Sequence, residues 1–136
     1  MSALPSEVSE LEAFLVGSGL TRTRFDRYPQ SFGNVIIEYS DGRFGVQIIC
    51  DRGIWCVTAS DMAGRPNEWY DAALLRDMVK GPGDDEPSLA KQIAIVQGHW
   101  QEICRSFSAK HRDETHARLD QLRKVRARRL FPGLSP

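Results

Sequence analysis

Two tight-turn signals a few residues apart constrain the fold of this chain more than any other feature. Asp41-Gly42 is typical of a two-residue hairpin turn, because that turn needs positive φ at both central positions, which Asp tolerates and Gly accepts. Asp51-Arg52-Gly53 suits a three-residue hairpin loop that is closed by a glycine in the left-handed region. The sequence from about residue 34 to residue 57 is therefore predicted to form an antiparallel meander.

The two turns also predict which side chains share a face, since side chains alternate along a strand. The first turn pairs Tyr39 with Phe44, Ile37 with Val46 and Val35 with Ile48, and the second places Cys50 opposite Ile54 and Ile48 opposite Cys56. The predicted core face then holds Val35, Ile37, Tyr39, Phe44, Val46, Ile48, Cys50, Ile54 and Cys56. The other face holds Asn34, Ile36, Glu38, Gly45, Gln47, Ile49, Trp55 and Val57, and its apolar members need a cover or a partner.

Helical periodicity surrounds this sheet on both sides. Helices are predicted from Pro5-Ser6 to about residue 16 with Gly17 after its end, from residue 68 to about residue 80 with Asn67 as its N-cap, from Pro87 to residue 107, and from about residue 109 to residue 129. A charged edge strand is expected from about residue 21 to residue 28. The predicted fold class is a single α+β domain over residues 1–136, with an N-terminal helix, an antiparallel meander of three to four strands, and three C-terminal helices packed on it.

The third of these helices carries its apolar residues at a seven-residue period, which favours an internal packing seam over a dimer interface. The last helix has few apolar positions and many charges. Residues 109–136 are therefore expected to form a basic, weakly anchored C-terminal helix and tail.

Composition limits the classes of function. Hydrophobic residues make up 41% of the chain and charged residues 26%, which is typical of a globular domain, and the 18 basic and 18 acidic residues leave no overall field. The three cysteines form an odd set after an N-terminus without an apolar leader, so free thiols in a reducing cytoplasm are expected. No apolar run approaches the roughly 20 residues that span a bilayer, so no membrane partner is expected.

No residue pattern predicts a catalytic, cofactor or metal site. The cysteines and histidines lack the paired spacing of a structural zinc site, and His99 and Cys104 are five residues apart, which turns their side chains away from each other on a helix. Asp84, Asp85 and Glu86 are explained by a solvated helix N-terminus rather than by an ion site. The chain is expected not to be an enzyme, although an unrecognised site assembled from distant residues stays open as an alternative.

Positive charge is concentrated near the C-terminus. Between Lys110 and Arg129 there are eight basic residues against three acidic ones, a local charge of +5 that leaves −5 for the rest of the chain. A nucleic-acid-associated accessory protein would use Arg123, Lys124, Arg126, Arg128 and Arg129 to neutralise phosphates. Alternatively, these residues complement the helix dipole, or pair with the acids at residues 7–12 or 84–86.

Three aromatic residues are candidate anchors for a partner protein: Trp55, Trp69 and Tyr70. Trp55 is predicted on the mixed face of the sheet, where the later helices cover it or a partner contacts it. With no catalytic candidate, the leading hypothesis is a non-enzymatic domain, monomeric or homodimeric, that binds another protein.

A resemblance supports the same hypothesis. The stretch FGNVIIEY from Phe32, the following strands from Gly45 and Arg52, and EWYD from Glu68 resemble small bacterial proteins that are grouped with the immunity proteins of polymorphic toxin systems. The likeness runs from about residue 32 to residue 107. It implies an inhibitor that blocks a cognate toxin by surface complementarity and carries no chemistry of its own.

Overall fold

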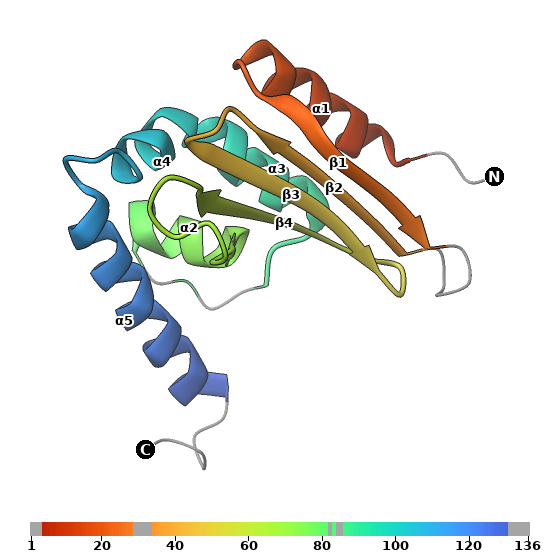
Figure 1. The fold of residues 1–136 in the computed structure, drawn as a ribbon. Helices are drawn as coiled ribbons and strands as arrows, with labels where there is room; N and C mark the ends of the chain where they lie inside the picture. The colour runs from red at the N-terminus through yellow and green to blue at the C-terminus, as the bar shows by residue number, and fades with distance from the viewer. Residues whose placement is uncertain (1–3, 29–33, 82, 84–85, 131–136) are drawn as a thin grey trace.

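The computed structural model describes residues 4–28, 34–81, 83 and 86–130. A helix leads into an antiparallel sheet with strand order β1-β2-β3-β4-β5, and the later helices pack against this sheet (Figure 1). The α+β class and the meander followed by C-terminal helices are therefore confirmed. The sheet has a short fifth strand, and the predicted long helix is divided in two.

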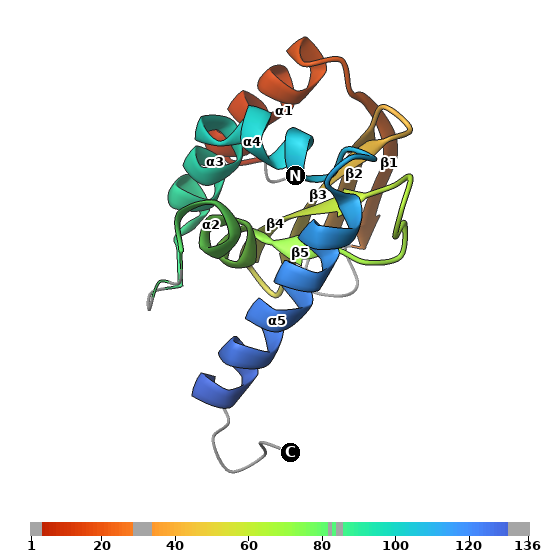
Figure 2. The same ribbon diagram turned by 90° about the vertical axis from the view of Figure 1, so that its left-hand side faces the viewer.

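The elements follow one another in a simple order: α1 (Ser6–Gly17), β1 (Thr21–Tyr28), β2 (Asn34–Ser40), β3 (Phe44–Asp51), β4 (Ile54–Asp61), β5 (Tyr70–Asp71), α2 (Ala72–Lys80), α3 (Leu89–Gly98), α4 (Trp100–Ser106) and α5 (Arg112–Leu130). Figure 2 shows α1 to α4 together on one side of the sheet, while α5 passes the β5 end and extends beyond it. The opposite side of the sheet is left without any of the first four helices.

The core lies between the sheet and these helices. The predicted core residues of β2 and β3 are confirmed as buried: Val35, Ile37, Tyr39, Phe44, Val46, Ile48 and Cys50. α1 adds Val8, Leu11 and Leu15, and the seven-residue repeat adds Ile93, Val96, Ile103 and Phe107. The repeat is thus an internal packing seam.

The first turn differs from its prediction in register but not in face. Tyr39 lies opposite Val46 and not opposite Phe44, because the loop is longer than two residues. The Asp41 carboxylate accepts hydrogen bonds from the backbone N–H groups of residues 43 and 44, at 2.9 and 2.8 Å, and only Gly42 has positive φ, at 89°. A shift of two positions keeps every side chain on its predicted face.

The second turn is shorter than predicted. Arg52 and Gly53 both have positive φ, at 54° and 81°, and Asp51 pairs directly with Ile54. This is a two-residue turn, which suits the right-handed twist of the flanking strands. The pairing of β4 with β3 therefore differs from the prediction by one residue.

A shift of one residue exchanges the two faces of β4, which corrects the predicted positions of its side chains. Ile54, predicted in the core, is 73% exposed, and Cys56 joins it on the open side. Val57, predicted outside, is fully buried. Trp55 turns to the core side, where it is partly buried against the hydrophobic cluster.

The helix predicted from residue 68 begins later, at Ala72. Tyr70 and Asp71 instead pair with the edge of β4, and the Asp71 side chain caps the helix by accepting from the Leu74 N–H at 2.9 Å. Asn67 is therefore not the N-cap. A strand bridge to the sheet takes precedence over helix propensity there.

The remaining helix boundaries also shift. Ser88 is the N-cap of α3, since its hydroxyl accepts from the Lys91 N–H at 3.3 Å, so Pro87 lies before the helix. His99, with φ of −115° and ψ of 20°, separates α3 from α4. The last helix begins at Arg112, after a turn in which the His111 N–H donates to the Ser108 carbonyl.

Candidate functional site

The candidate site is the sheet surface opposite α1 to α4, called here the open face. Its centre is a row of three neighbouring side chains on β2, β3 and β4, namely Ile36, Ile49 and Cys56, all partly exposed. Tyr28 on β1 and Ile54 on β4 belong to the neighbouring row, where Asn34 and Asp51 lie between them, and they are 41% and 73% exposed. The open face thus presents a contiguous apolar strip that the described residues leave uncovered.

Polar groups border this strip. Glu38 and Gln47 form the next cross-strand pair, and the Gln47 amide donates to the Glu38 carboxylate at 2.9 Å. At the edge of the sheet, Arg24 forms an ion pair with Asp26. These groups satisfy one another, so the strip has an apolar centre and a polar border.

The open face continues into a pocket of about 430 Å³ beneath the second half of α5, called here the α5 hollow. It is lined by Cys56, Thr58, Trp69, Asp71, Leu74, Arg123, Arg126, Ala127 and Leu130. Cys56 belongs both to the hollow and to the apolar row, so the two surfaces are continuous. The Thr58 hydroxyl is buried and has no hydrogen-bond partner among the described residues.

The first half of α5 is fixed to the domain by a buried carboxylate. Asp61, at the end of β4, accepts from Arg112 Nε at 2.7 Å and from the Gly64 N–H at 3.1 Å. His116 Nε2 lies 3.1 Å from Asp61 Oδ2 without the alignment of a hydrogen bond. Leu119, fully buried, adds an apolar anchor one turn further along. This part of α5 belongs to the core, unlike the weakly anchored helix expected from the sequence.

The space around Asp61 leaves no room for a side chain at Gly64. A Cβ built there would meet Arg112 Cδ at 2.5 Å and Asp61 Oδ2 at 2.6 Å. The glycine therefore lets the loop after β4 approach the ion pair closely. The sequence shows none of this cluster, because Asp61 and Arg112 are 51 residues apart.

The second half of α5 is held by arginines. The contacts are Arg123 to Glu68 and the Trp69 carbonyl, Arg126 to Asp71 and Glu86, and Arg129 to the Gly83 carbonyl, at 2.7 to 2.8 Å. Three of the five residues proposed for phosphate binding thus have acceptors within the chain. The contact with Glu86 agrees with the alternative in which these arginines pair with the acids at residues 84–86. The other two acids of that group, Asp84 and Asp85, lie outside the described residues. Lys124 and Arg128 are exposed on the remaining surface of the helix.

The three aromatic residues predicted as anchors for a partner lie in different environments. Tyr70 is fully buried, with its ring stacked on Phe107 at 6.0 Å between centroids and the Arg123 guanidinium 4.6 Å from its ring centre, so it is a core residue and not a docking residue. Trp55 is partly buried on the core side. Trp69 lines the α5 hollow, so it alone of the three lies on the candidate surface.

Burial is the largest cause of the raised pKa values of Cys56, Cys104, Tyr39 and Tyr70. Burial raises the pKa of Cys56, and it raises the pKa of Cys104 to about 11, so neither thiol is a thiolate at neutral pH. Burial and the neighbouring Glu12 carboxylate raise the pKa of Tyr39. No group of three or more His, Cys, Asp or Glu side chains gathers as a metal site would require within the part of the chain that the structure describes.

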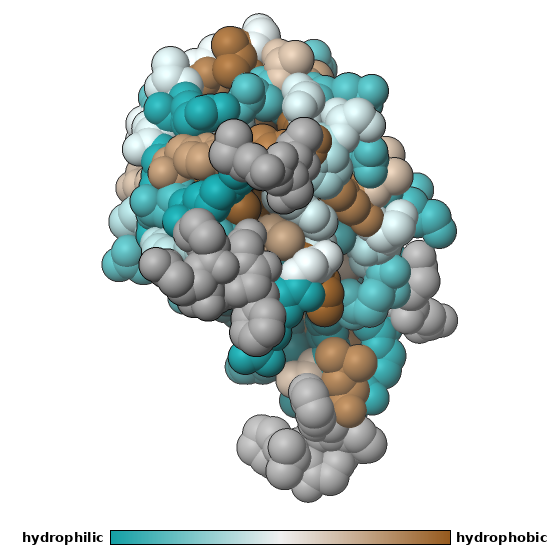
Figure 3. All heavy atoms as spheres, turned by 90° about the vertical axis from the view of Figure 1, so that its right-hand side faces the viewer, coloured by the Kyte–Doolittle hydropathy of each residue, from teal (hydrophilic) through white to brown (hydrophobic). Residues whose placement is uncertain are grey.

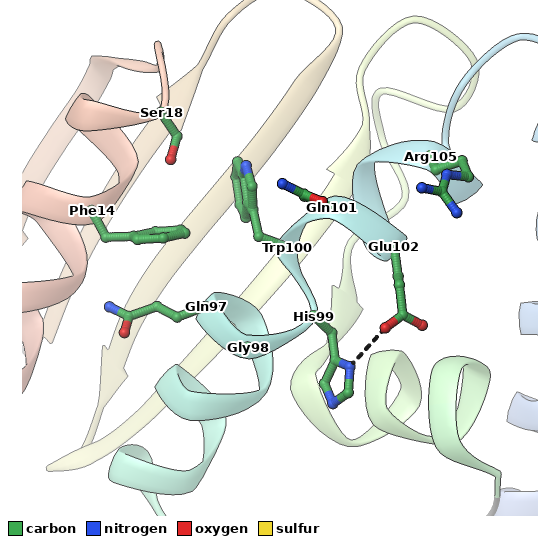
Figure 4. Close-up of a pocket in the computed structure, with 9 residues that line it drawn as sticks. All are labelled: Phe14, Ser18, Gln97, Gly98, His99, Trp100, Gln101, Glu102 and Arg105. Atoms are coloured by element: carbon green, nitrogen blue, oxygen red, sulfur yellow. Dashed lines mark hydrogen bonds and ion pairs between the residues drawn. The ribbon is translucent and has the colours of Figure 1, made fainter.

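A second pocket, of about 490 Å³, lies between α1 and the turn from α3 to α4. Figure 4 shows Phe14 and Trp100 pointing toward each other across it, and their rings meet edge to face at 5.4 Å. His99, in the turn between α3 and α4, lies 3.3 Å from Glu102 of α4, and the Glu102 side chain is 55% exposed.

No family model, curated protein or solved structure matches this chain. The resemblance to immunity proteins therefore stays a prediction. None of the described helices has the length and apolar character needed to cross a membrane.

Proposed function

We propose that this chain is a non-enzymatic protein-binding domain whose docking surface is the open face of its sheet. The observation that carries the proposal is the partly exposed apolar row Ile36, Ile49 and Cys56, with Ile54 beside it at 73% exposure. An apolar centre with a satisfied polar border is the arrangement found in protein interfaces. Contiguous exposed apolar surface on a sheet is otherwise an aggregation hazard, which a partner removes.

The charges favour a protein over a nucleic acid as the partner. Arg123, Arg126 and Arg129 already have acceptors within the chain, so binding a phosphate would first require breaking those contacts. Lys124 and Arg128 alone supply few phosphate contacts, whereas affinity for nucleic acid grows with the number of neutralised phosphates. The accessory role in nucleic-acid binding therefore has less support than protein binding.

The finer form of the proposal is an immunity-type inhibitor that covers a toxin one-to-one. Its support is the sequence resemblance together with a surface suited to complementarity rather than to chemistry. Co-expression with the product of a neighbouring toxin-like reading frame tests this form. Restored growth of the toxin-expressing host is expected, and continued killing at equal expression of both proteins would contradict it.

The docking surface is tested by copurification from the native host with quantitative mass spectrometry. The test variant is Ile54→Asp on the open face, and the matched control is Val16→Asp on α1, where the side chain is 55% exposed. Loss of an interface anchor costs about 2 kcal/mol, so the test variant should recover at least about tenfold less partner than the wild type. The control should recover a one-to-one partner as the wild type does.

Two outcomes would contradict the proposal. One is recovery of the wild-type protein alone, without a stoichiometric partner. The other is a partner that binds Ile54→Asp as tightly as it binds Val16→Asp. Matching thermal unfolding curves of the two variants are the folding control.

A further inference from the structure

β1 is an edge strand whose outer side pairs with no other strand in the part of the chain that the structure describes. It has a neighbour on one side only, β2, and six of its eight residues are exposed. Figures 1 and 2 show it at the margin of the sheet, while α1 lies over the helix side. An edge strand directs alternate N–H and C=O groups away from its sheet, where a further strand can pair with them.

Charged side chains and a bulge restrict what can pair with this edge. The register between β1 and β2 shifts between Arg22 and Arg24, and it is regular over the five residues from Arg24 to Tyr28. The sequence of this regular segment is Arg-Phe-Asp-Arg-Tyr, with both signs of charge. A strand that pairs here must therefore match the order of these charges.

The side chains of this segment alternate between the two faces of the sheet. Phe25 and Arg27 lie opposite buried core residues of β2, on the helix side, whereas Arg24, Asp26 and Tyr28 are on the open face. If two copies of β1 form one continuous antiparallel sheet, their open faces lie on the same side, so opposite residues come from the same face. The two-fold axis between the copies then passes through a residue and not between two residues.

One such axis brings opposite charges together. An axis through Arg24, Asp26 or Arg27 places that charge opposite its own copy, which is destabilising. An axis through Tyr28 would extend the pairing past the end of the strand. An axis through Phe25 places each Arg24 opposite Asp26 of the second copy and the two Phe25 side chains opposite each other. The segment is thus complementary to itself in a single register.

Phe25 is exposed at the position of this axis. Its side chain is 40% exposed, and the guanidinium groups of Arg22 and Arg27 lie 5.1 and 5.9 Å from its ring centre. Two aromatic side chains that meet across strands stabilise the pairing beyond the area they bury. Figure 3, viewed from the side where β1 ends, shows small apolar areas separated by hydrophilic surface. Recognition at this edge therefore depends on backbone pairing, one aromatic contact and the order of charges.

We propose that β1 pairs with β1 of a second copy, antiparallel and in register about Phe25, so that the protein forms a two-fold dimer through this edge. On the open side, the ion pair that Arg24 and Asp26 form within each strand becomes a network of four alternating charges. The 18 basic and 18 acidic residues of the chain leave no net charge that opposes association. The three central residue pairs lie in the regular part of both strands, and the bulge limits pairing beyond them, so the dimer is weak and reversible.

Sedimentation equilibrium of the full chain, from about 10 µM to about 1 mM at low salt, tests this proposal. A monomer–dimer equilibrium is expected, with a Kd of about 0.5 mM or tighter. Asp26→Arg places an arginine opposite each Arg24 and should weaken the dimer at least about tenfold. The matched control Asp113→Arg makes the same change of charge at an exposed position of α5 and should leave the Kd unchanged.

A double variant tests the register itself. Arg24→Asp combined with Asp26→Arg exchanges the two charges, so each aspartate again lies opposite an arginine of the second copy. The Kd should return to within about threefold of the wild-type value. The two side chains are 42% and 40% exposed, so these variants should keep the fold, which matching thermal unfolding curves would establish.

A wild-type chain that stays monomeric at about 1 mM would overturn the proposal. Equal dimerisation of Asp26→Arg and Asp113→Arg would do the same, as would a double variant that dimerises as weakly as Asp26→Arg. A dimer that is lost in Ile54→Asp but retained in Asp26→Arg would assign self-association to the open face and also overturn it. The proposed docking surface is judged separately, by recovery of the native partner with Ile54→Asp.

Discussion

The buried ion pair at the start of α5 gives the sharpest prediction about stability. Asp61 has no exposed side-chain surface, and it accepts from Arg112 Nε at 2.7 Å and from the Gly64 N–H at 3.1 Å. The change Asp61→Asn keeps the shape of the side chain and removes its charge. Arg112, whose side chain is 26% exposed, then loses its carboxylate partner.

The expected cost follows from this burial. Removing one member of a buried ion pair usually costs about 3–5 kcal/mol, because the other charge stays buried without compensation. Arg112 reaches solvent in part, and the asparagine oxygen still accepts one hydrogen bond, so the lower end applies. We expect a loss of about 3 kcal/mol in the free energy of unfolding, and a fall in Tm of about 10 °C for a domain of this size.

Urea unfolding followed by far-UV circular dichroism measures this loss. The control is Asp120→Asn, which breaks the contact of Asp120 with Arg65 at 3.1 Å, where the two side chains are 45% and 35% exposed. An exposed pair of this kind contributes less than about 1 kcal/mol. Equal losses for the two variants, or a loss below about 1 kcal/mol for Asp61→Asn, would refute the reasoning.

Three further predictions concern single side chains. Gln92→Ala removes a side-chain amide that forms hydrogen bonds with two backbone groups of β4, at 2.8 and 3.3 Å. It should lower the free energy of unfolding in urea by about 2 kcal/mol, whereas the control Gln101→Ala, at an exposed position, should lower it by less than about 0.5 kcal/mol. Cys104, with its pKa raised by burial to about 11, should react with Ellman's reagent at pH 7.5 at least about tenfold more slowly in the folded than in the denatured chain; equal rates would contradict this. The hydrogen bond from Arg22 lowers the pKa of Glu12, so the stability that Glu12 contributes is present above its unfolded pKa of about 4.3 and lost as the pH falls through the folded value. The stability difference between wild type and Glu12→Gln should therefore shrink as the pH falls below about 4.3 and vanish below the folded pKa of Glu12; a difference that does not change with pH would contradict the pairing.

The sequence predicted the central strands because their alternation survives an error in register. Phe44 and Val46 are on the predicted face although the first turn is longer than expected, since the error is two residues. At the second turn the error in register is one residue, and an error of one residue does exchange the faces. Arg52 adopts positive φ, which few residues other than glycine do, and the resulting shift of one residue moved Ile54 and Val57 to the opposite faces.

The site itself was only partly predictable. The sequence places Ile36 and Ile49 on the face of the sheet opposite the core, which predicted that this face needs a cover or a partner. In the structure both side chains are partly exposed on that face. Tyr70 was a candidate anchor for a partner, because no local pattern shows that it pairs with β4 and is fully buried. The α5 hollow depends on contacts between residues about 55 positions apart, such as Arg123 with Glu68, and periodicity carries no information about them.

The most direct measurement is the accessibility of the isoleucine methyl groups to a water-soluble gadolinium chelate, read from methyl NMR spectra of the full chain. The open face requires strong broadening of Ile54 and clear broadening of Ile36 and Ile49, with Ile37 and Ile48 unaffected beneath the helices. If Ile36 and Ile49 are as protected as Ile37 and Ile48, the sheet has no open face and the proposed docking surface does not exist.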